Sequence, residues 1–244
     1  MIRNLDMTAD KLTGCLLTNS LHRVIMGMDL LPPSTCPCCG YYGLFGHDGM
    51  PARIGVRCPS CQSLDRHRLL TLAMQRGLVT IKGRSVLHFA PEAFISKLLE
   101  AEQPSSYRTS NYPDLDGADL RLNIEAIDLP DGSVDVVVCS HVLEHVDDRK
   151  ALGEIHRILS PGGLLVAMVP IIEGWETTYE NPSVNDDEGR TYYFGQKDHI
   201  RYYGADFRDR VRAAGFTLEE FTASGEDSPK YRLSRGMKVF LGRK

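Results

Sequence analysis

The pattern of apolar and polar positions changes character near residue 84. Before that point, apolar residues recur at helical spacing over residues 1–31 and again from Ser63 to Gly77, with short glycine-rich text between them. Pro32 and Pro33 end the first stretch, because proline lacks a backbone donor and restricts the residue before it. The pattern predicts a helical segment over residues 1–31, followed by a small module and a helix over residues 32–78.

Beyond residue 84, short apolar runs alternate with amphipathic ones. The apolar runs predict strands over residues 85–90, 107–111, 120–124, 134–140, 164–170, 216–223 and 236–242, and the amphipathic runs predict helices over residues 94–102, 149–160 and 205–215. This order predicts an α/β domain over residues 79–244, with a mostly parallel seven-stranded sheet and helices on both faces. Ligands in such sheets bind at the carboxyl ends of the strands.

Residues 172–200 interrupt this alternation with a polar, aromatic insertion that has little periodicity. A long insertion inside a compact domain is usually functional, and its place after the fifth strand predicts a substrate lid. Candidate catalytic residues are Tyr193, His199 as a general base near neutral pH, and Arg201 as a holder of a substrate carboxylate or phosphate. The alternative is that Asp198, His199 and Arg201 only tie the lid to the core.

Two cysteine pairs lie in the small module. Cys36 and Cys39 form one CxxC pair, and Cys58 and Cys61 form the other after 18 intervening residues. Two pairs at this separation predict a tetrahedral Zn²⁺ bound by four thiolates, a filled shell that makes the ion structural. No export signal is recognisable, which favours a metal over disulfides and a cytoplasmic location. Cys38 and His47 are the alternative ligands.

Two stretches of the α/β domain carry a family resemblance. The segments IDLPDGSVDVVVCSHVLEHVDD (127–148) and RILSPGGLLVAMVP (157–170) resemble the class I methyltransferases that use S-adenosylmethionine (SAM), specifically those with a type 11 core. The resemblance implies a Rossmann-like fold and SAM as cofactor. It places the cofactor-binding positions at His88, Phe89, Ala90, Pro91 and Glu92 after the first strand, Asn111 and Tyr112 after the second, Asn123 and Ile124 beside the adenine, and Ser140 and His141 near the sulfonium.

Three of these positions depart from the family pattern. Ala90 stands where the family has a glycine, Asn111 where it has a carboxylate that accepts both ribose hydroxyls, and Asn123 on the adenine side is also altered. Asp114 is an alternative partner for the ribose. The resemblance implies that Glu92 faces the ammonium of SAM. No acidic cluster that would hold a metal for the methyl transfer itself is evident in the sequence.

The composition narrows the possible partners. Residues 1–84 contain ten Lys and Arg against five Asp and Glu, a net of +5, so the remaining 160 residues hold 18 against 27, a net of −9. No apolar run reaches the roughly 20 residues that a membrane span needs.

We expect a methyltransferase that acts on an O or N atom of a small biosynthetic molecule. One alternative is an RNA methyltransferase whose module binds phosphates through Arg53, Arg57, Arg66 and Arg68. Another is a non-catalytic interaction protein with this fold. The oligomeric state is left open.

Overall fold

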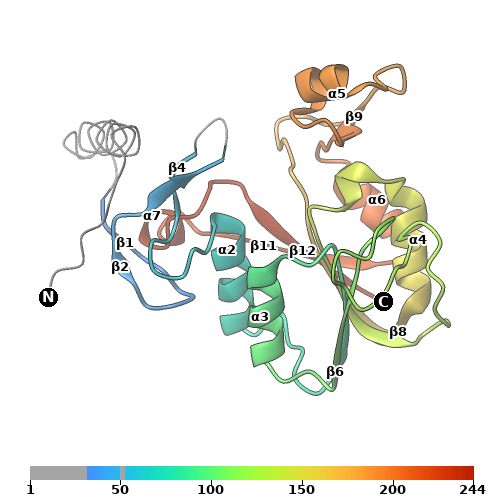
Figure 1. Ribbon diagram of the computed structural model, residues 1–244, viewed down its shortest axis with the longest axis horizontal. Coiled ribbons are helices and arrows are strands. Elements are labelled where there is room, and N and C mark those ends of the chain that lie inside the picture. Colours follow the sequence, from blue (N-terminus) through green and yellow to red (C-terminus); the bar gives the residue numbers. More distant parts are fainter. Residues whose placement is uncertain (1–31, 50–52) are drawn as a thin grey trace, which may run out of the picture.

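A computed structural model describes residues 32–49 and 53–244, so the helical segment predicted over residues 1–31 lies outside the described residues (Figure 1). A six-stranded sheet forms the core. Its strands lie in the order β11 (Thr217–Thr222), β12 (Lys238–Arg243), β8 (Leu159–Met168), β7 (Val134–Ser140), β5 (Ser85–Phe89) and β6 (Ser106–Ser110). Strands β6, β5, β7 and β8 are parallel, whereas β12 runs antiparallel to both of its neighbours. The predicted, mostly parallel α/β sheet is therefore confirmed.

The expected seventh strand, over residues 120–124, is not formed in the described part of the chain. Leu120 makes one isolated parallel bridge with Ser110, and Asn123 bridges back to Ala126. The Asn123 side chain accepts a hydrogen bond from the backbone N–H of Glu125, which closes a local turn. Asparagine favours such turns over a continued strand. The apolar positions of this run pack beneath the sheet without joining it.

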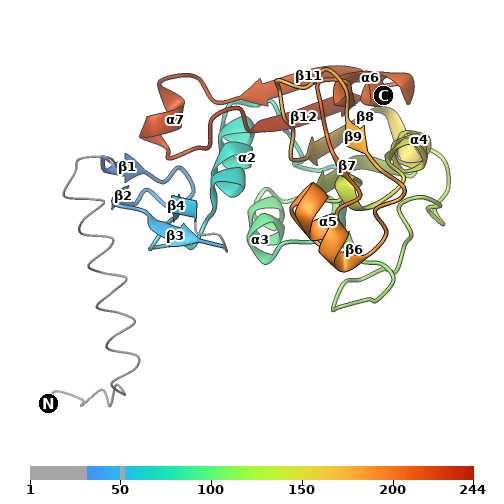
Figure 2. The ribbon, with the colours of Figure 1, turned by 90° about the horizontal axis from the view of Figure 1, so that it is seen from above.

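Helices cover both faces of the sheet. Helices α2 (Asp65–Gln75) and α3 (Ala93–Ala101) pack on one face, and α4 (Asp148–Ile158) and α6 (Phe207–Ala213) pack on the other (Figure 2). Along β7, Val136 and Val138 face α2 and α3, whereas Val137 and Cys139 face α4 and α6. Neighbouring side chains of a strand point to opposite faces, so a strand covered on both sides becomes continuously apolar.

The small module lies at one end of the molecule, beside α2 and α7 (Asp227–Lys230) (Figure 1). It contains two antiparallel pairs, β1 (Ser34–Thr35) with β2 (Tyr42–Gly43), and β3 (Gly46–Asp48) with β4 (Arg53–Arg57).

Arg68 of α2 joins this module to the segment between α7 and β12. Its fully buried guanidinium donates to the carbonyls of Val56 and Ser63 and to those of Tyr231 and Arg232. This buried side chain, together with contacts such as Ser34 with Pro229 and Arg232 with Gly55, fastens the module to the α/β domain.

The insertion contains its own small elements. Strands β9 (Tyr179–Glu180) and β10 (Arg201–Tyr202) pair antiparallel, and helix α5 (Asp187–Phe194) lies between them. A short 3-10 helix, η1 (Leu143–His145), follows β7. In Figure 1, α5 and β9 project from the core above this end of the sheet. Within residues 32–49 and 53–244, no helix has the length and apolar character to cross a membrane.

Candidate functional site

The cysteine cluster has the dimensions of a zinc site. The sulfur atoms of Cys36, Cys39, Cys58 and Cys61 all lie within 4.8 Å of one another. The Sγ–Sγ distances are 3.7 Å between Cys36 and Cys61 and 3.8 Å between Cys39 and Cys58. A tetrahedral ion with Zn–S bonds of about 2.3 Å would separate its sulfurs by about 3.8 Å. The residues present therefore fit Zn²⁺.

The alternative ligands lie outside this cluster. The Cys38 sulfur is 3.2 Å from the hydroxyl of Thr71 on α2, and His47 is exposed on β3. Gly40 directly follows the first pair with a φ of +76°, a left-handed turn that suits glycine and folds the chain back over the sulfurs. Ser63 lies within 3.3 Å of the Cys36 sulfur and 3.2 Å of the Cys61 sulfur. The start of α2 is thus placed against the metal ligands.

The ends of strands β5, β6 and β7 form the candidate cofactor edge. Ala90 follows β5 with a φ of +48°, and His141 follows β7 with a φ of +57°. Both are non-glycine residues in the left-handed region, a conformation that costs energy and that concentrates at functional sites. Ala90 therefore keeps the backbone turn for which the related family uses glycine. Ser140, at the tip of β7, is buried between these two turns.

Glu92 is clamped by the first turn of α2. Arg66 donates from Nε to both carboxylate oxygens, at 3.0 and 2.9 Å, and the His67 Nε2 lies 2.9 Å from one of them. The Ser140 hydroxyl lies 3.4 Å from the other. Burial raises the pKa of Glu92, but the hydrogen bonds from His67 and Arg66 outweigh it and lower this pKa to about 2. The carboxylate expected to face the SAM ammonium is already paired with the Arg66 guanidinium and hydrogen-bonded by His67, whose Nδ1 accepts from the backbone N–H of Leu64, so Glu92 holds the loop against α2.

His88 and Phe89 do not face the cofactor edge. The buried His88 ring places Nδ1 2.7 Å from the hydroxyl of Tyr107, and burial lowers the pKa of His88 to about 4. The Phe89 side chain belongs to the core cluster beneath α4 and α6. Of the positions expected to bind the cofactor, His88 and Phe89 thus use their side chains in the core, and their backbone with the following turn and Pro91 lies at the edge.

The expected adenine and ribose positions gather around a second part of this edge. Asn111 directly follows β6, and its side chain makes no hydrogen bond within the described residues. A hollow of about 400 Å³ is lined by residues that include Tyr112 and Asn123. Ile124 is buried in the core beside it. The carboxamide oxygen of Asn123 accepts a hydrogen bond from the backbone N–H of Glu125, and its NH₂ group remains available as a donor.

A group of histidines surrounds a buried glutamate where η1 meets the insertion. The ligand atoms of Glu144, His145 and His199 lie within 4.8 Å of one another, and the rings of the two histidines are 4.7 Å apart between centroids. His141 places Nδ1 3.1 Å from a Glu144 oxygen. Burial is the largest influence on His199 and lowers its pKa, so its imidazole is neutral near pH 7. The structure thus places His199, the expected base, beside Glu144 and His145 of η1, the short helix that follows β7.

Arg201 is a framework residue. Its buried guanidinium donates to the Glu180 carboxylate at 2.7 Å and to the carbonyls of Leu143 and Val146. It also lies 3.6 Å from the buried Asp148 carboxylate. These partners occupy Nε and Nη1 and enclose the side chain. The expectation that Arg201 holds a substrate anion is therefore corrected in favour of the alternative, in which it ties the insertion to the core.

The base of the insertion is a closed stem. Besides the β9–β10 pair, the backbone N–H of Ala205 donates to the Trp175 carbonyl, and Asp206 accepts from the N–H and hydroxyl of Thr178 at 2.7 and 2.6 Å. A Cβ at Gly204 would lie 2.6 Å from the Thr177 backbone, so the two chain segments touch as closely as glycine allows. The expected catalytic Tyr193 lies above this stem on α5, half exposed.

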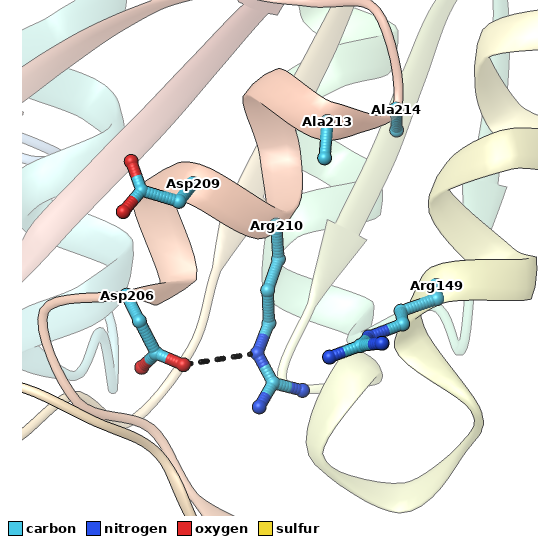
Figure 3. A pocket seen from close by; sticks show the side chains of 6 residues that line it. All are labelled: Arg149, Asp206, Asp209, Arg210, Ala213 and Ala214. Carbon is cyan, nitrogen blue, oxygen red and sulfur yellow. Dashed lines mark hydrogen bonds and ion pairs between the residues drawn. The ribbon is translucent and has the colours of Figure 1, made fainter.

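Another hollow, of about 490 Å³, lies between α4 and α6 (Figure 3). Figure 3 shows Arg210 turned toward Asp206, and Arg210 also donates to Asp148 at 3.0 Å. None of the residues that line this hollow belongs to the turns after β5, β6 or β7. We therefore place the site at the strand ends and regard this groove as a charged seam between two helices.

Two functional features were missed by the sequence reasoning. From the sequence, Arg66 is considered only as a phosphate binder and His67 is given no role, although both lie in the first turn of α2, shortly after Cys61 and Ser63. The Glu144 carboxylate was also overlooked. Its signal was the spacing His141-x-x-Glu144-His145, which puts three potential ligands within one turn.

Comparison with known proteins agrees with this geometry. Residues 101–167 match a family model described as a methyltransferase domain. In the solved structures, an S-adenosylmethionine-dependent methyltransferase from Mesorhizobium loti superposes with a TM-score of 0.53 at 15% identity, over 72% of this chain and 98% of that chain. The core therefore has the fold of these S-adenosylmethionine-dependent methyltransferases, and residues 101–167 carry the sequence pattern of a methyltransferase domain.

Further relatives support the methyltransferase domain. A putative methyltransferase solved in complex with the Trm112 activator of Haloferax volcanii is similar with a TM-score of 0.51 at 19% identity, over 73% of this chain and 90% of that chain. An uncharacterized methyltransferase of Mycobacteroides abscessus is 35% identical over 85 residues, which are 34% of this chain and 30% of that relative. The aligned segment thus spans less than a third of that relative's length.

Proposed function

We propose that the chain transfers a methyl group from SAM to an oxygen or nitrogen atom of a small molecule, with a structural Zn²⁺ in the N-terminal module. The observation that carries this proposal is the meeting of three turns at the ends of β5, β6 and β7, two of them left-handed at Ala90 and His141, within a class I methyltransferase domain. In open α/β sheets, ligands bind in the crevice at this edge.

The residues of this edge have the donor set that SAM requires. The backbone of the Ala90–Pro91–Glu92 turn would hold the methionine part, the Asn111 carboxamide would bind a ribose hydroxyl, and Asn123 with Ile124 would border the adenine. Ser140 and His141 would lie beside the reacting end. SAM supplies a methyl group already activated on a sulfonium, so the protein has mainly to position the acceptor and accept its proton.

His199 is the proposed proton acceptor. Its Nδ1 lies 3.2 Å from the Phe194 carbonyl, and because a carbonyl only accepts, Nδ1 carries the proton and Nε2 keeps a free lone pair. When the acceptor attacks the methyl carbon, the methyl–sulfur bond breaks, and the proton of the acceptor passes to this Nε2 or to water. Tyr193 on α5 is half exposed, and we propose that it contacts the acceptor.

The proposed small-molecule acceptor is favoured over RNA by the state of four arginines. Arg53 and Arg57 pair with Asp48, Arg66 pairs with Glu92, and Arg68 is fully buried. Phosphate binding needs free cationic side chains, so these four do not form a ready phosphate surface. Filter binding of bulk RNA at low salt tests the alternative, and tight binding that weakens steeply with added salt would favour RNA.

Calorimetric titration of the full chain with S-adenosylhomocysteine tests the proposed cofactor site. We expect saturable binding that Asn111→Leu weakens by at least about tenfold, because a lost ribose hydrogen bond in a desolvated site costs about 1–3 kcal/mol. The exposed Lys97→Gln on α3 serves as a surface control and should leave the affinity unchanged. A chain that is folded and zinc-loaded but takes up no nucleoside at millimolar ligand would refute the proposal and favour an interaction protein.

A further inference from the structure

Glu144 presents a buried carboxylate oxygen that lacks a partner. The side chain is fully buried, and only its Oε1 is engaged, by His141 Nδ1 at 3.1 Å. In the part of the chain that the structure describes, Oε2 makes no hydrogen bond. An unpaired carboxylate oxygen in a buried position is costly, because no water replaces the lost hydration. A positively charged ligand at Oε2 would remove that cost.

The two neighbouring histidines, whose ring centroids lie 4.7 Å apart, each engage one ring nitrogen and keep the other available. His145 Nδ1 lies 3.0 Å from the Asp198 carbonyl, and His199 Nδ1 lies 3.2 Å from the Phe194 carbonyl. Since a carbonyl has no proton to give, each Nδ1 is the donor and each Nε2 is left as an acceptor. Metal-binding histidines characteristically donate their second nitrogen to a carbonyl or carboxylate in this way.

We propose that Glu144, His145 and His199 form a second metal site, which binds one divalent transition-metal ion through Glu144 Oε2 and the two Nε2 atoms. When the ion is bound, the lone pair of His199 Nε2 is a metal ligand, so the proton of the acceptor passes to water and not to His199. This ion is separate from the Zn²⁺ proposed for the four cysteines. One carboxylate and two imidazoles suit ions such as Zn²⁺, Co²⁺, Fe²⁺ or Mn²⁺ rather than Ca²⁺ or Mg²⁺, which prefer oxygen ligands alone. His141 is a positioning residue that orients the Glu144 carboxylate.

The geometry allows such an ion with a small closure. One potential ligand atom of each of the three residues lies within 4.8 Å of the other two, whereas bonds of about 2.0–2.2 Å would place neighbouring ligand atoms about 3–3.5 Å apart. Closure by about 1–2 Å is required, and His145, whose side chain is 26% exposed, has the freedom to rotate inward. Glu144 and His199 are held in place by their buried surroundings.

The position of this site suggests its use. Glu144 and His145 lie in η1, directly after the carboxyl end of β7, and His199 lies at the end of the insertion, before β10. Three protein ligands leave further positions on the ion for an acceptor. We assign to these positions an acceptor with two adjacent oxygen or nitrogen ligands, such as a vicinal diol or a hydroxy acid. This assignment of a substrate class rests on the proposed methyl transfer, whereas the metal site itself does not.

Titration of the zinc-loaded full chain with Co²⁺ tests the site. With the cysteines occupied by Zn²⁺, we expect one further equivalent of Co²⁺ to bind. Its visible absorption should lack the sulfur-to-metal charge-transfer band that thiolate ligands produce. Glu144→Gln and His199→Gln should abolish this binding. His141→Gln should weaken it by about 10–100-fold, the usual effect of losing a residue that orients a ligand. His47→Gln, an exposed histidine of the small module, is the matched control and should not change it.

Each outcome of the titration is informative. Binding that depends on Glu144 and His199, in variants whose far-ultraviolet dichroism matches the wild type, supports the site. Absence of the further equivalent, an equal affinity in all variants, or a thiolate band would overturn it. Should a variant fail to fold, metal-induced stabilisation of the wild type against heat, with and without Co²⁺, decides the same question. Because no nucleoside is present, failure of S-adenosylhomocysteine to bind would refute the methyltransferase proposal and leave the metal result standing.

Discussion

Replacing Arg68 by methionine is expected to destabilise the protein severely. The guanidinium is fully buried and donates to four carbonyls, at distances of 2.9 Å to Tyr231, 3.0 Å to Val56, 2.8 Å to Ser63 and 2.5 Å to Arg232. It also lies 4.7 Å above the centre of the Phe45 ring. Four thiolates around one Zn²⁺ carry a net charge of about −2, so a buried cation beside them is electrostatically favourable.

The magnitude follows from these contacts. A hydrogen bond to a charged group contributes about 1.5–3 kcal/mol, but burying the cation offsets much of the sum. Methionine fills a similar volume and leaves four carbonyls unpaired, so we expect a loss of about 4 kcal/mol. For a chain of this size, that loss lowers the melting temperature by about 8–16 °C. Unfolding of the module should release the zinc. Ser63 links the two parts, because its carbonyl accepts from Arg68 and its hydroxyl contacts the sulfurs of Cys36 and Cys61.

Urea unfolding followed by circular dichroism, with zinc release read by a chromogenic chelator, measures this effect. Arg53→Met is the matched control. Arg53 is 45% exposed and lies 3.4 Å from Asp65, so its loss should cost no more than about 1 kcal/mol. If Arg68→Met unfolds within about 1 kcal/mol of the wild type, the buried guanidinium does not join the module to the segment between α7 and β12, and our reasoning is wrong.

Three further predictions concern the cofactor edge and its supports. Ala90→Gly should stabilise the free protein by about 1 kcal/mol, measured by urea unfolding, because Ala90 has a φ of +48°; unchanged stability would show that this turn is unstrained. Asn111→Asp should tighten S-adenosylhomocysteine binding by about tenfold in calorimetry, since a carboxylate accepts both ribose hydroxyls; weaker binding would exclude this contact. Burial lowers the His88 pKa from 6.5 to about 4, so the unfolded chain takes up its proton first as the pH falls. About 3 kcal/mol of stability should therefore disappear between pH 6.5 and pH 4, and His88→Gln should lack this part of the acid loss in a pH series of unfolding curves.

The sequence was sufficient for those parts of the fold that depend on local patterns. The run from Val134 to Ser140 is apolar at almost every position, so its burial on both faces could be read directly. The cluster of four cysteines could be predicted because each CxxC turn brings its own two sulfurs together. Residues 120–124 have the same apolar character as a strand, yet the turn at Asn123 prevents them from joining the sheet.

The candidate site was less predictable, because its contacts join distant segments. Arg201 has the chemistry of an anion binder, and only the fold shows that Glu180 and the carbonyls after β7 already occupy it. The Arg66–Glu92 pair spans 26 residues and links a helix to a strand end. The spacing of His141, Glu144 and His145 was visible in the sequence, but only the fold brings His199, more than fifty residues later, beside them. Sequence spacing predicts contacts within one helix or strand, but it does not predict contacts between segments that are distant in the sequence.

The closed stem beneath the insertion has an evolutionary consequence. Its two strands are joined by the β9–β10 pair, by Asp206 with Thr178, and by the close approach at Gly204. The segment between Glu180 and His199 is therefore held at a fixed base, the closed stem. We expect that this segment can be replaced without disturbing the sheet. Related enzymes that keep the closed stem and vary the segment above it would acquire new acceptors and retain the same cofactor edge. Grafting is a practical route to altered specificity here, with His199 as the boundary that every graft must respect.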